Sequence, residues 1–289
     1  MINKKKILIA GGDLRQLYCA RRLSEKYQVS VRGFGRDYFP PDIRLNRPEE
    51  EFCFDYAVLP VPPLDSEGML NAPCSERKHH ISEILSLLKP EGVIFAGKVD
   101  CGLRDIVCAN EICDYMCREE LNLLNAVPSA EGAVQIALEE LPVTISGLNV
   151  LITGFGRIGA ALANILKGFG ADVTAAVRNV QGRARAKAAG VKSCFVSDID
   201  CRYDLVFNTV PALIFDRELL SSFSRDTLFI DLASKPGGID FEAAAELGIR
   251  AVWALGLPGK TAPVTAGEII ADTISGMIGE RSSEHGEKI

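Results

Sequence analysis

Short apolar runs alternate with amphipathic stretches in the first part of the chain. The runs at 7–10, 29–34, 55–59 and 93–96 predict strands, and the pattern over 75–88 predicts a helix. Gly11 and Gly12 predict a turn after the first strand, and Asp13 with Gln16 predicts a capping box at the start of the next helix. Alternating strands and helices of this kind predict a parallel sheet with crossover helices.

The second part of the chain is organised around residues 149–178. An apolar strand at 150–153 runs into the turn Gly154-Phe155-Gly156-Arg157-Ile158-Gly159, a helix with apolar residues at helical spacing, and a strand at 173–177. In this context G-x-G-x-x-G is typical of a dinucleotide-binding site. Its first glycine permits the tight turn, the second admits a pyrophosphate and the third lets the helix pack closely on the strand.

Further strands are predicted at 194–196, 204–209, 228–232 and 249–255, with a short helix at 182–189. Because parallel strands end at a common sheet edge, the residues that follow them should lie near the glycine turn. We therefore expect the following residues to join the turn in a cofactor site: Thr209, Val210, Pro211, Asp231, Ser234 and Leu257.

These elements predict an α/β fold with two doubly wound parallel-sheet domains, of which the second is a Rossmann dinucleotide-binding domain. We expect an N-terminal substrate-side domain over 1–127, an interdomain helix over 128–142 that begins at Pro128, and an NADP-binding domain over 143–264. Thr265 and Glu268 predict a capping box for a last helix over 265–280, whose apolar stripe would return it to the first domain.

The end of the strand at 173–177 predicts which cofactor binds. A carboxylate there would bond the ribose of NAD, whereas this chain has Arg178 beside Asn179, with Arg183 and Arg185 following. Because a guanidinium pairs with a 2′-phosphate, the sequence favours NADP over NAD. The alternative is that these arginines form a solvated helix face.

Composition removes several classes of function. The chain has 289 residues, 47% of them hydrophobic and 24% charged, and a net charge of −6, which disfavours nucleic acid and anionic membranes as partners. Nine cysteines indicate reduced thiols rather than a disulfide framework. Cys108, Cys113 and Cys117 lack a C-x-x-C pair and a nearby histidine, so no metal site is expected.

Cations near the predicted strand ends are candidates for binding an anionic substrate. Arg15 lies at a helix N-terminus and Lys98 follows the strand at 93–96. Each has an equally ordinary alternative, a surface salt bridge for Arg15 and a solvated loop position for Lys98. Glu131 would complement the dipole of the predicted interdomain helix or serve as a catalytic carboxylate.

Several stretches together resemble one family. These are GGDLRQ, NAVPSAEG at 125–132, GFGRIG, NTVPA, DLASKPGG and LGLPGKTAPVTAG, in an order that extends over nearly the whole chain. They are similar to the A subunits of dipicolinate synthase, with Ser129 where a threonine is expected. A wider likeness to the 2-hydroxyacid and alanine dehydrogenases accompanies this resemblance and implies the same two-domain arrangement.

The resemblance implies an NADP-dependent oxidation of a dihydrodipicolinate precursor to dipicolinate during sporulation, in the mother-cell cytoplasm. It also implies that the partner is a flavoprotein-like B subunit, and we expect an oligomer. Such chemistry needs cations for two carboxylates and a base for one proton. Arg15, Lys98 and Lys260 are the cationic candidates, and Glu131 and Glu119 are the candidate bases. A 4-hydroxylated precursor would also need an acid to help water leave.

Two other functions remain open at this stage. A stand-alone 2-hydroxyacid or amino-acid dehydrogenase usually needs a catalytic histidine. The three histidines here, His79, His80 and His285, lie outside the predicted strand ends of the second domain, which lowers this possibility. The other is a regulatory subunit that senses NADP without catalysing hydride transfer.

Overall fold

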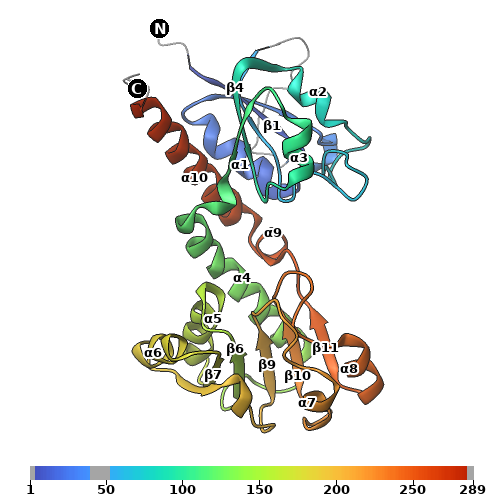
Figure 1. Ribbon diagram of the computed structural model, residues 1–289, viewed down its shortest axis with the longest axis vertical. Coiled ribbons are helices and arrows are strands. Elements are labelled where there is room, and N and C mark those ends of the chain that lie inside the picture. The colour runs from blue at the N-terminus through green and yellow to red at the C-terminus, as the bar shows by residue number, and fades with distance from the viewer. Residues whose placement is uncertain (1–3, 40–52, 285–289) are drawn as a thin grey trace. The chain divides into compact units, whose positions relative to one another are not determined.

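The computed structural model describes residues 4–39 and 53–284 and contains two compact units. Unit 1 combines Met1–Leu124 with Ala262–Ile289, and unit 2 is Asn125–Thr261. Each unit has its own sheet (Figure 1). Among the described residues, none of the helices combines the length and the apolar character that crossing a membrane would require.

Unit 1 contains a five-stranded parallel sheet in the order β2-β1-β3-β4-β5. Its strands are β1 (Lys6–Ala10), β2 (Gln28–Arg32), β3 (Phe54–Val58), β4 (Leu88–Ala96) and β5 (Glu111–Asp114). Strand β1, which pairs with β2 and β3, alternates its side chains between two separate cores, with Ile7 and Ile9 in one and Leu8 and Ala10 in the other. Burial on both faces explains why this strand is apolar throughout.

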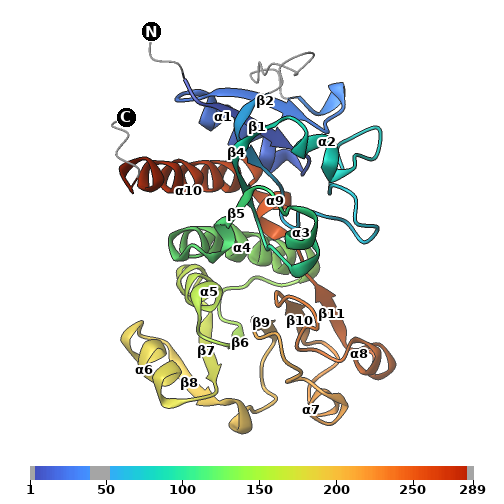
Figure 2. The ribbon, with the colours of Figure 1, turned by 45° about the horizontal axis from the view of Figure 1, so that its top comes forward.

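Helices cover both faces of this sheet. On the Ile7 face lie α1 (Leu14–Ser24) and α10 (Pro263–Glu284), which pack against each other (Figure 2). On the Leu8 face lie α2 (Ile81–Leu85) and α3 (Cys101–Ile106). A Cβ on Gly267 of α10 would come within 2.4 Å of the Arg15 carbonyl oxygen, so this glycine permits the close approach of α10 to α1.

Unit 2 contains a six-stranded parallel sheet in the order β11-β10-β9-β6-β7-β8. Its strands are β6 (Asn149–Thr153), β7 (Asp172–Val177), β8 (Lys192–Phe195), β9 (Leu205–Asn208), β10 (Leu228–Asp231) and β11 (Arg250–Trp253). Counted from β6, this is the 3-2-1-4-5-6 order of the Rossmann fold, with its reversal between β6 and β9.

Two buried clusters also flank the second sheet. The first contains residues of α4 (Glu119–Glu140), α5 (Arg157–Gly168), α6 (Val180–Ala188) and α9 (Leu257–Thr261). The second contains residues of α7 (Arg217–Ser221) and α8 (Phe241–Leu247). Val150 and Ile152 of β6 belong to the first cluster and Leu151 to the second. The sequence-based prediction of two parallel α/β sheets is therefore confirmed.

The prediction that a helix begins at Pro128 is wrong. Pro128 lies inside α4, which begins at Glu119, and the boundary between the two units falls within this helix, after Leu124. Proline favours a first helical turn, because inside a helix it lacks the N–H of one hydrogen bond and its ring crowds the carbonyl four residues earlier, yet α4 continues through Pro128. Glu131 is consequently a mid-helix residue and does not complement the dipole of a first turn.

Two other predicted helix limits are also wrong. Helix α10 begins at Pro263, so Thr265 lies within it and caps nothing, while Glu268 pairs with Arg21 of α1 at 3.4 Å. The predicted helix at 75–88 contains only α2, whose capping box is formed by His80 and Glu83, and β4 begins at Leu88. Strand β5 was not predicted.

Candidate dinucleotide-binding site

The glycine turn between β6 and α5 has a different steric requirement at each glycine. Gly154 has φ +85°, and a Cβ there would lie 2.6 Å from Thr209 Oγ1. A Cβ on Gly159 would lie 2.3 Å from the Gly154 carbonyl oxygen, which accounts for the close packing of helix on strand. A Cβ on Gly156 would meet no protein atom within 4 Å. Neither the backbone angle nor packing therefore demands glycine at 156, but close approach of a ligand does.

Gly156 also caps α5, and a glycine cap offers no side chain to accept a hydrogen bond from the first turn of this helix. The positive end of its dipole thus lies at a cap without a side chain, an arrangement that suits an anion. The residues present fit the pyrophosphate of a dinucleotide, because they combine space, donors and a favourable dipole.

A groove of about 470 Å³ lies beside this turn, at the carboxyl ends of β6, β7 and β9. Nine of the predicted cofactor residues line it: Gly154, Phe155, Gly156, Arg157, Arg178, Asn179, Thr209, Val210 and Pro211. Arg185 lines it as well, whereas Arg183 lies over the Phe195 ring. The lining holds three arginines and, within the described part of the chain, no carboxylate.

Asn179 stabilises the far wall of the groove. It caps α6, its Oδ1 accepting a hydrogen bond from Gly182 N at 2.9 Å. A Cβ on Gly182 would lie 2.9 Å from Val177 Cβ, so α6 approaches the end of β7 closely. Arg178 is exposed and lies between β7 and α6, outside both elements.

A buried polar network joins the strand ends beneath the groove. Thr153 Oγ1 donates to Asn208 Oδ1 at 2.5 Å, and Asn208 Nδ2 donates to Asp231 Oδ1 at 2.7 Å. The other Asp231 oxygen accepts from Gly238 N at 2.7 Å. All three side chains are fully buried. The network therefore fixes the relative positions of β6, β9 and β10.

This network corrects one predicted contact and adds two unpredicted residues. Asp231 has no exposed side-chain surface through which to touch a cofactor, so it orients Asn208 and the loop after β10. Sequence reasoning missed Thr153 and Asn208 as supporting residues. The available signal was a polar residue ending each apolar strand, since a buried polar group requires a partner.

The other predicted cofactor residues lie outside the groove lining. Ile158 is partly buried in α5, Gly159 is buried against the turn, and Ser234 is exposed in the loop after β10. Leu257 is buried in the core of unit 2 and does not offer its side chain to a ligand. A Cβ on Gly132 would lie 3.1 Å from Leu257 Cβ, so α9 packs directly on α4.

Arg15 is held by its own helix cap. Asp13 caps α1 and accepts from Arg15 N, while Arg15 Nη2 donates to Asp13 Oδ2 at 2.8 Å and Nε donates to Oδ1 at 2.9 Å. Burial alone would lower the pKa of Arg15, but the Asp13 carboxylate more than offsets this and raises it. The predicted capping box is wrong, because Gln16 is buried instead of reaching back to the cap.

The remaining substrate and catalytic candidates are exposed. Lys98 follows β4 with φ +65°, and its N–H donates to Asp114 Oδ1 at 3.1 Å. Glu119 lies in the first turn of α4, Glu131 farther along that helix and Lys260 in α9. Arg15 and Lys98 thus belong to unit 1, and Glu131 and Lys260 to unit 2.

Comparison with known proteins identifies the family. Residues 6–116 match the model of the N-terminal domain of the dipicolinate synthase A subunit. Residues 128–239 match that of the NAD-binding domain of D-isomer specific 2-hydroxyacid dehydrogenases. Over 297 residues the chain is 32% identical to the dipicolinate synthase A subunit of Bacillus subtilis (strain 168), covering 99% of this chain and 100% of that protein. The chain belongs to the family of dipicolinate synthase A subunits.

Solved structures of this family have the same fold. The crystal structure of the dipicolinate synthase A subunit from Bacillus halodurans has a TM-score of 0.86 at 30% identity, covering 96% of this chain and 98% of that one. The dipicolinate synthase structure from Bacillus subtilis has a TM-score of 0.85 at 31% identity, covering 98% and 99%. The D-lactate dehydrogenase of Salmonella and an L-alanine dehydrogenase, both 13% identical, show the fold alone.

The family assignment agrees with the groove geometry. The matched NAD-binding domain, 128–239, contains the glycine turn and every residue that lines the groove. Unit 2 is therefore a dehydrogenase domain for a nicotinamide dinucleotide, and the family is one of oxidoreductases.

Proposed function

We propose that this chain catalyses the NADP-dependent oxidation of a dihydrodipicolinate-type precursor to dipicolinate, pyridine-2,6-dicarboxylate. The observation that carries this proposal is the 32% identity to a dipicolinate synthase A subunit over both units, rather than over the dinucleotide-binding unit alone. The glycine-capped N-terminus of α5 and the groove beside it support this proposal, because such an oxidation needs a cofactor site.

The choice of NADP over NAD rests on the charge of the groove. An adenosine ribose placed at the end of β7 would lie near Arg178, with Arg185 in the last turn of α6 also lining the groove. No carboxylate among the described lining residues is available to accept hydrogen bonds from the two hydroxyls of NAD. Guanidinium groups instead favour a 2′-phosphate, with which they form bidentate hydrogen bonds.

The oxidation requires the loss of a hydride and a proton from the precursor ring as it becomes aromatic. The nicotinamide, when bound, accepts the hydride. The protein must hold the ring through its two carboxylates and receive the proton. Arg15, Lys98 and Lys260 are the proposed carboxylate ligands, and Glu131 or Glu119 is the proposed base. The Thr153-Asn208-Asp231 network would keep the strand ends in place during turnover.

A partner protein and a cellular setting complete the proposal. Because the B. subtilis relative is named as one subunit of its enzyme, we infer that this chain acts with a flavoprotein-like B subunit. The setting we infer is the mother-cell cytoplasm of a sporulating bacterium.

The test is to incubate the purified chain, with and without its B subunit, with NADP and enzymatically made precursor. We expect dipicolinate absorbance to rise together with NADPH. No dipicolinate in either mixture, with NADP or with NAD, would reject the proposal. Turnover of a simple 2-hydroxyacid by the chain alone would support a stand-alone dehydrogenase. Cofactor binding without hydride transfer would support a regulatory subunit.

Lys260→Ala separates substrate binding from cofactor binding. If Lys260 holds a substrate carboxylate, KM for the precursor should rise by about tenfold or more, the effect of losing one charge-assisted hydrogen bond. The dissociation constant for NADP should stay unchanged. Equal loss of both would count against a carboxylate-binding role.

A further inference from the structure

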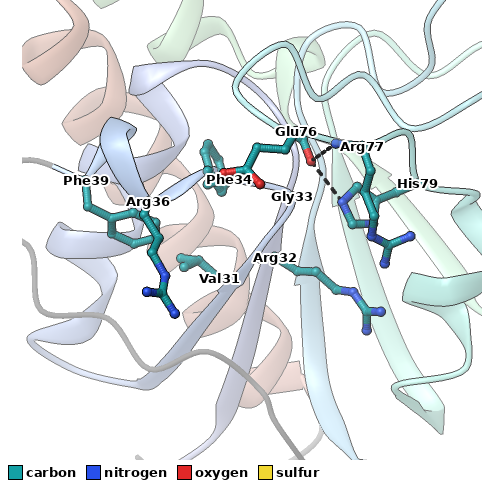
Figure 3. A pocket seen from close by; sticks show the side chains of 11 residues that line it. Val31, Arg32, Gly33, Phe34, Arg36, Phe39, Glu76, Arg77 and His79 are labelled. Carbon is teal, nitrogen blue, oxygen red and sulfur yellow. Dashed lines mark hydrogen bonds between the residues drawn. The ribbon is translucent and has the colours of Figure 1, made fainter.

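Unit 1 contains a pocket of its own, at the carboxyl end of β2. Its volume is about 680 Å³, within the range of about 300–1,000 Å³ typical of small-molecule sites. Figure 3 shows Arg36 and Phe39 on one side of it and Arg32, Arg77 and His79 on the other. Neither Arg15 nor Lys98 lines it, so it is distinct from the proposed substrate-binding residues.

The backbone holds the two walls of this pocket together. Gly33 has φ +82°, which turns the chain sharply after β2, and a Cβ there would lie 3.2 Å from Gly11 N. Gly35 N then donates to the Cys74 carbonyl oxygen at 2.7 Å, linking the wall at 31–39 to the wall at 75–79. The pocket is thus built on hydrogen-bonded backbone rather than on side chains alone.

The charge of the pocket favours an anion. Among the described residues, three arginines and one acid, Glu76, line it. Glu83 lies behind the wall and accepts from Arg32 at 3.2 Å and from Arg77 at 2.9 Å, which fixes both guanidinium groups and offsets part of their charge. Arg36 is exposed, and among the described residues no carboxylate pairs with it.

The pocket also offers an aromatic surface. Phe34 is buried, and Phe39, half-buried, packs edge-on against it with ring centroids 6.4 Å apart. Both rings line the cavity. A half-exposed aromatic ring beside arginines suits a ligand that has both a flat ring and an anionic group.

The glycine turn of unit 1 excludes a dinucleotide from this position. In unit 2 the groove at the end of β7 continues to the glycine-capped N-terminus of α5, whereas in unit 1 the carboxylate of Asp13 already occupies the N-terminus of α1. A pyrophosphate there would be repelled. The ligand must therefore be smaller and interact with the end of β2 alone.

We propose that this pocket binds a small aromatic anion, with its ring against Phe39 and a phosphate or carboxylate on Arg36 and Arg77. A mononucleotide and an aromatic dicarboxylate share this chemistry. Glu76, which lies near the Gly35 backbone, would accept a hydrogen bond from a ring nitrogen or a hydroxyl of the ligand.

The test is isothermal titration calorimetry on the full-length chain with saturating NADP, which fills the groove of unit 2. The probes are AMP, pyridine-2,6-dicarboxylate and inorganic phosphate. At least one aromatic probe should bind with 1:1 stoichiometry and more tightly than phosphate. AMP binding identifies a phosphate ligand and dicarboxylate binding a carboxylate ligand. Saturable binding of neither, or phosphate binding as tightly as both, overturns the proposal.

Three variants locate the binding. Arg36→Gln should lower the affinity for the probe by about tenfold, the effect of losing one charge-assisted hydrogen bond. Phe39→Ala should weaken the aromatic probe but not phosphate. Arg104→Gln removes an exposed arginine of α3 that does not line the pocket, so it should leave affinity unchanged. Unchanged affinity in Arg36→Gln, or equal losses in Arg36→Gln and Arg104→Gln, would contradict the assigned site.

Discussion

The two units contain the same local motif, strand–glycine turn–helix–strand, with opposite outcomes at the turn. In unit 1 a Cβ on Gly12, at φ +92°, would lie 2.4 Å from Gln16 Cγ, and Asp13 caps the helix with its own carboxylate. In unit 2 Gly156 faces open space and leaves the helix without a side-chain cap. A glycine required by packing and a glycine required by a ligand therefore have different steric surroundings.

The ends of the second strands differ in the same way. Arg32, at the end of β2, is paired with Glu83, whereas the groove that Arg178 lines at the end of β7 has no acid among its described residues. Unit 1 thus partly neutralises the arginine at the end of its second strand, whereas no described acid lines the groove beside Arg178 in unit 2.

Gly156→Asp should have the largest effect. We expect NADP affinity to fall by more than about a hundredfold, since the new carboxylate fills the space at the α5 N-terminus and repels phosphate. Thermal stability should barely change, because nothing in the protein opposes the side chain. Gly168→Asp, at an exposed helical glycine with equally open space, is the matched control and should bind normally. Unchanged NADP affinity in Gly156→Asp would reject the site.

Gly12→Ala should have the opposite effect: it should lower the free energy of unfolding and leave the affinity for NADP unchanged. The positive φ and the overlap with Gln16 and Pro60 should cost about 2–4 kcal/mol in the free energy of unfolding. Gly276→Ala, at an exposed helical glycine of the same unit, should be neutral or slightly stabilising. Urea denaturation measures both, and equal stabilities would show that the unit 1 turn is not packed as described.

Arg178→Asp should invert the cofactor preference. The ratio of the NADP to the NAD dissociation constant should shift by about a hundredfold toward NAD, because a guanidinium–phosphate contact is replaced by repulsion. Arg183→Asp is the matched control, since Arg183 lies over Phe195 and does not line the groove. Fluorescence titration with both cofactors decides the matter, and tighter NAD binding by the unchanged protein would already contradict the assignment.

Much of the fold followed from the sequence because its strands are buried on both faces. Continuous apolar runs such as 150–153 can be recognised without tertiary information. The turn at 154–159 was equally recognisable, since its glycine spacing and flanking elements are both local. The errors arose where distant packing decides. Pro128 continues a helix whose two halves are buried in different units, with Leu121 in one core and Ala133 in the other.

The supporting residues of the site were harder to predict than its lining. Asp231 was predicted to contact the cofactor because it follows a strand at the right edge, but it is buried and held by Asn208 and Gly238. Which polar residue at a strand end faces a ligand, and which faces its neighbours, depends on register between strands far apart in sequence. The pocket at the end of β2 could not be predicted from the sequence for the same reason, since residues 31–39 and 75–79 meet only in the folded unit.

The smallest expected effect concerns Glu83, the acid that pairs with Arg32 and Arg77 in unit 1. Burial alone would raise the pKa of Glu83, but Arg77 and His79, with the His80 backbone N–H, lower it to about 2 from an ordinary 4.5. Because the folded-state pKa is the lower one, Glu83 stabilises the fold above about pH 4.5, and this contribution is lost as the pH falls toward 2. Urea denaturation at several pH values should show the stability difference between the natural chain and Glu83→Gln shrinking over that interval. A difference that stays constant from pH 6 to about pH 2.5 would mean that Arg32 and Arg77 are not held by this carboxylate, and the contrast between Arg32 and Arg178, whose groove has no acid among its described lining residues, would be lost.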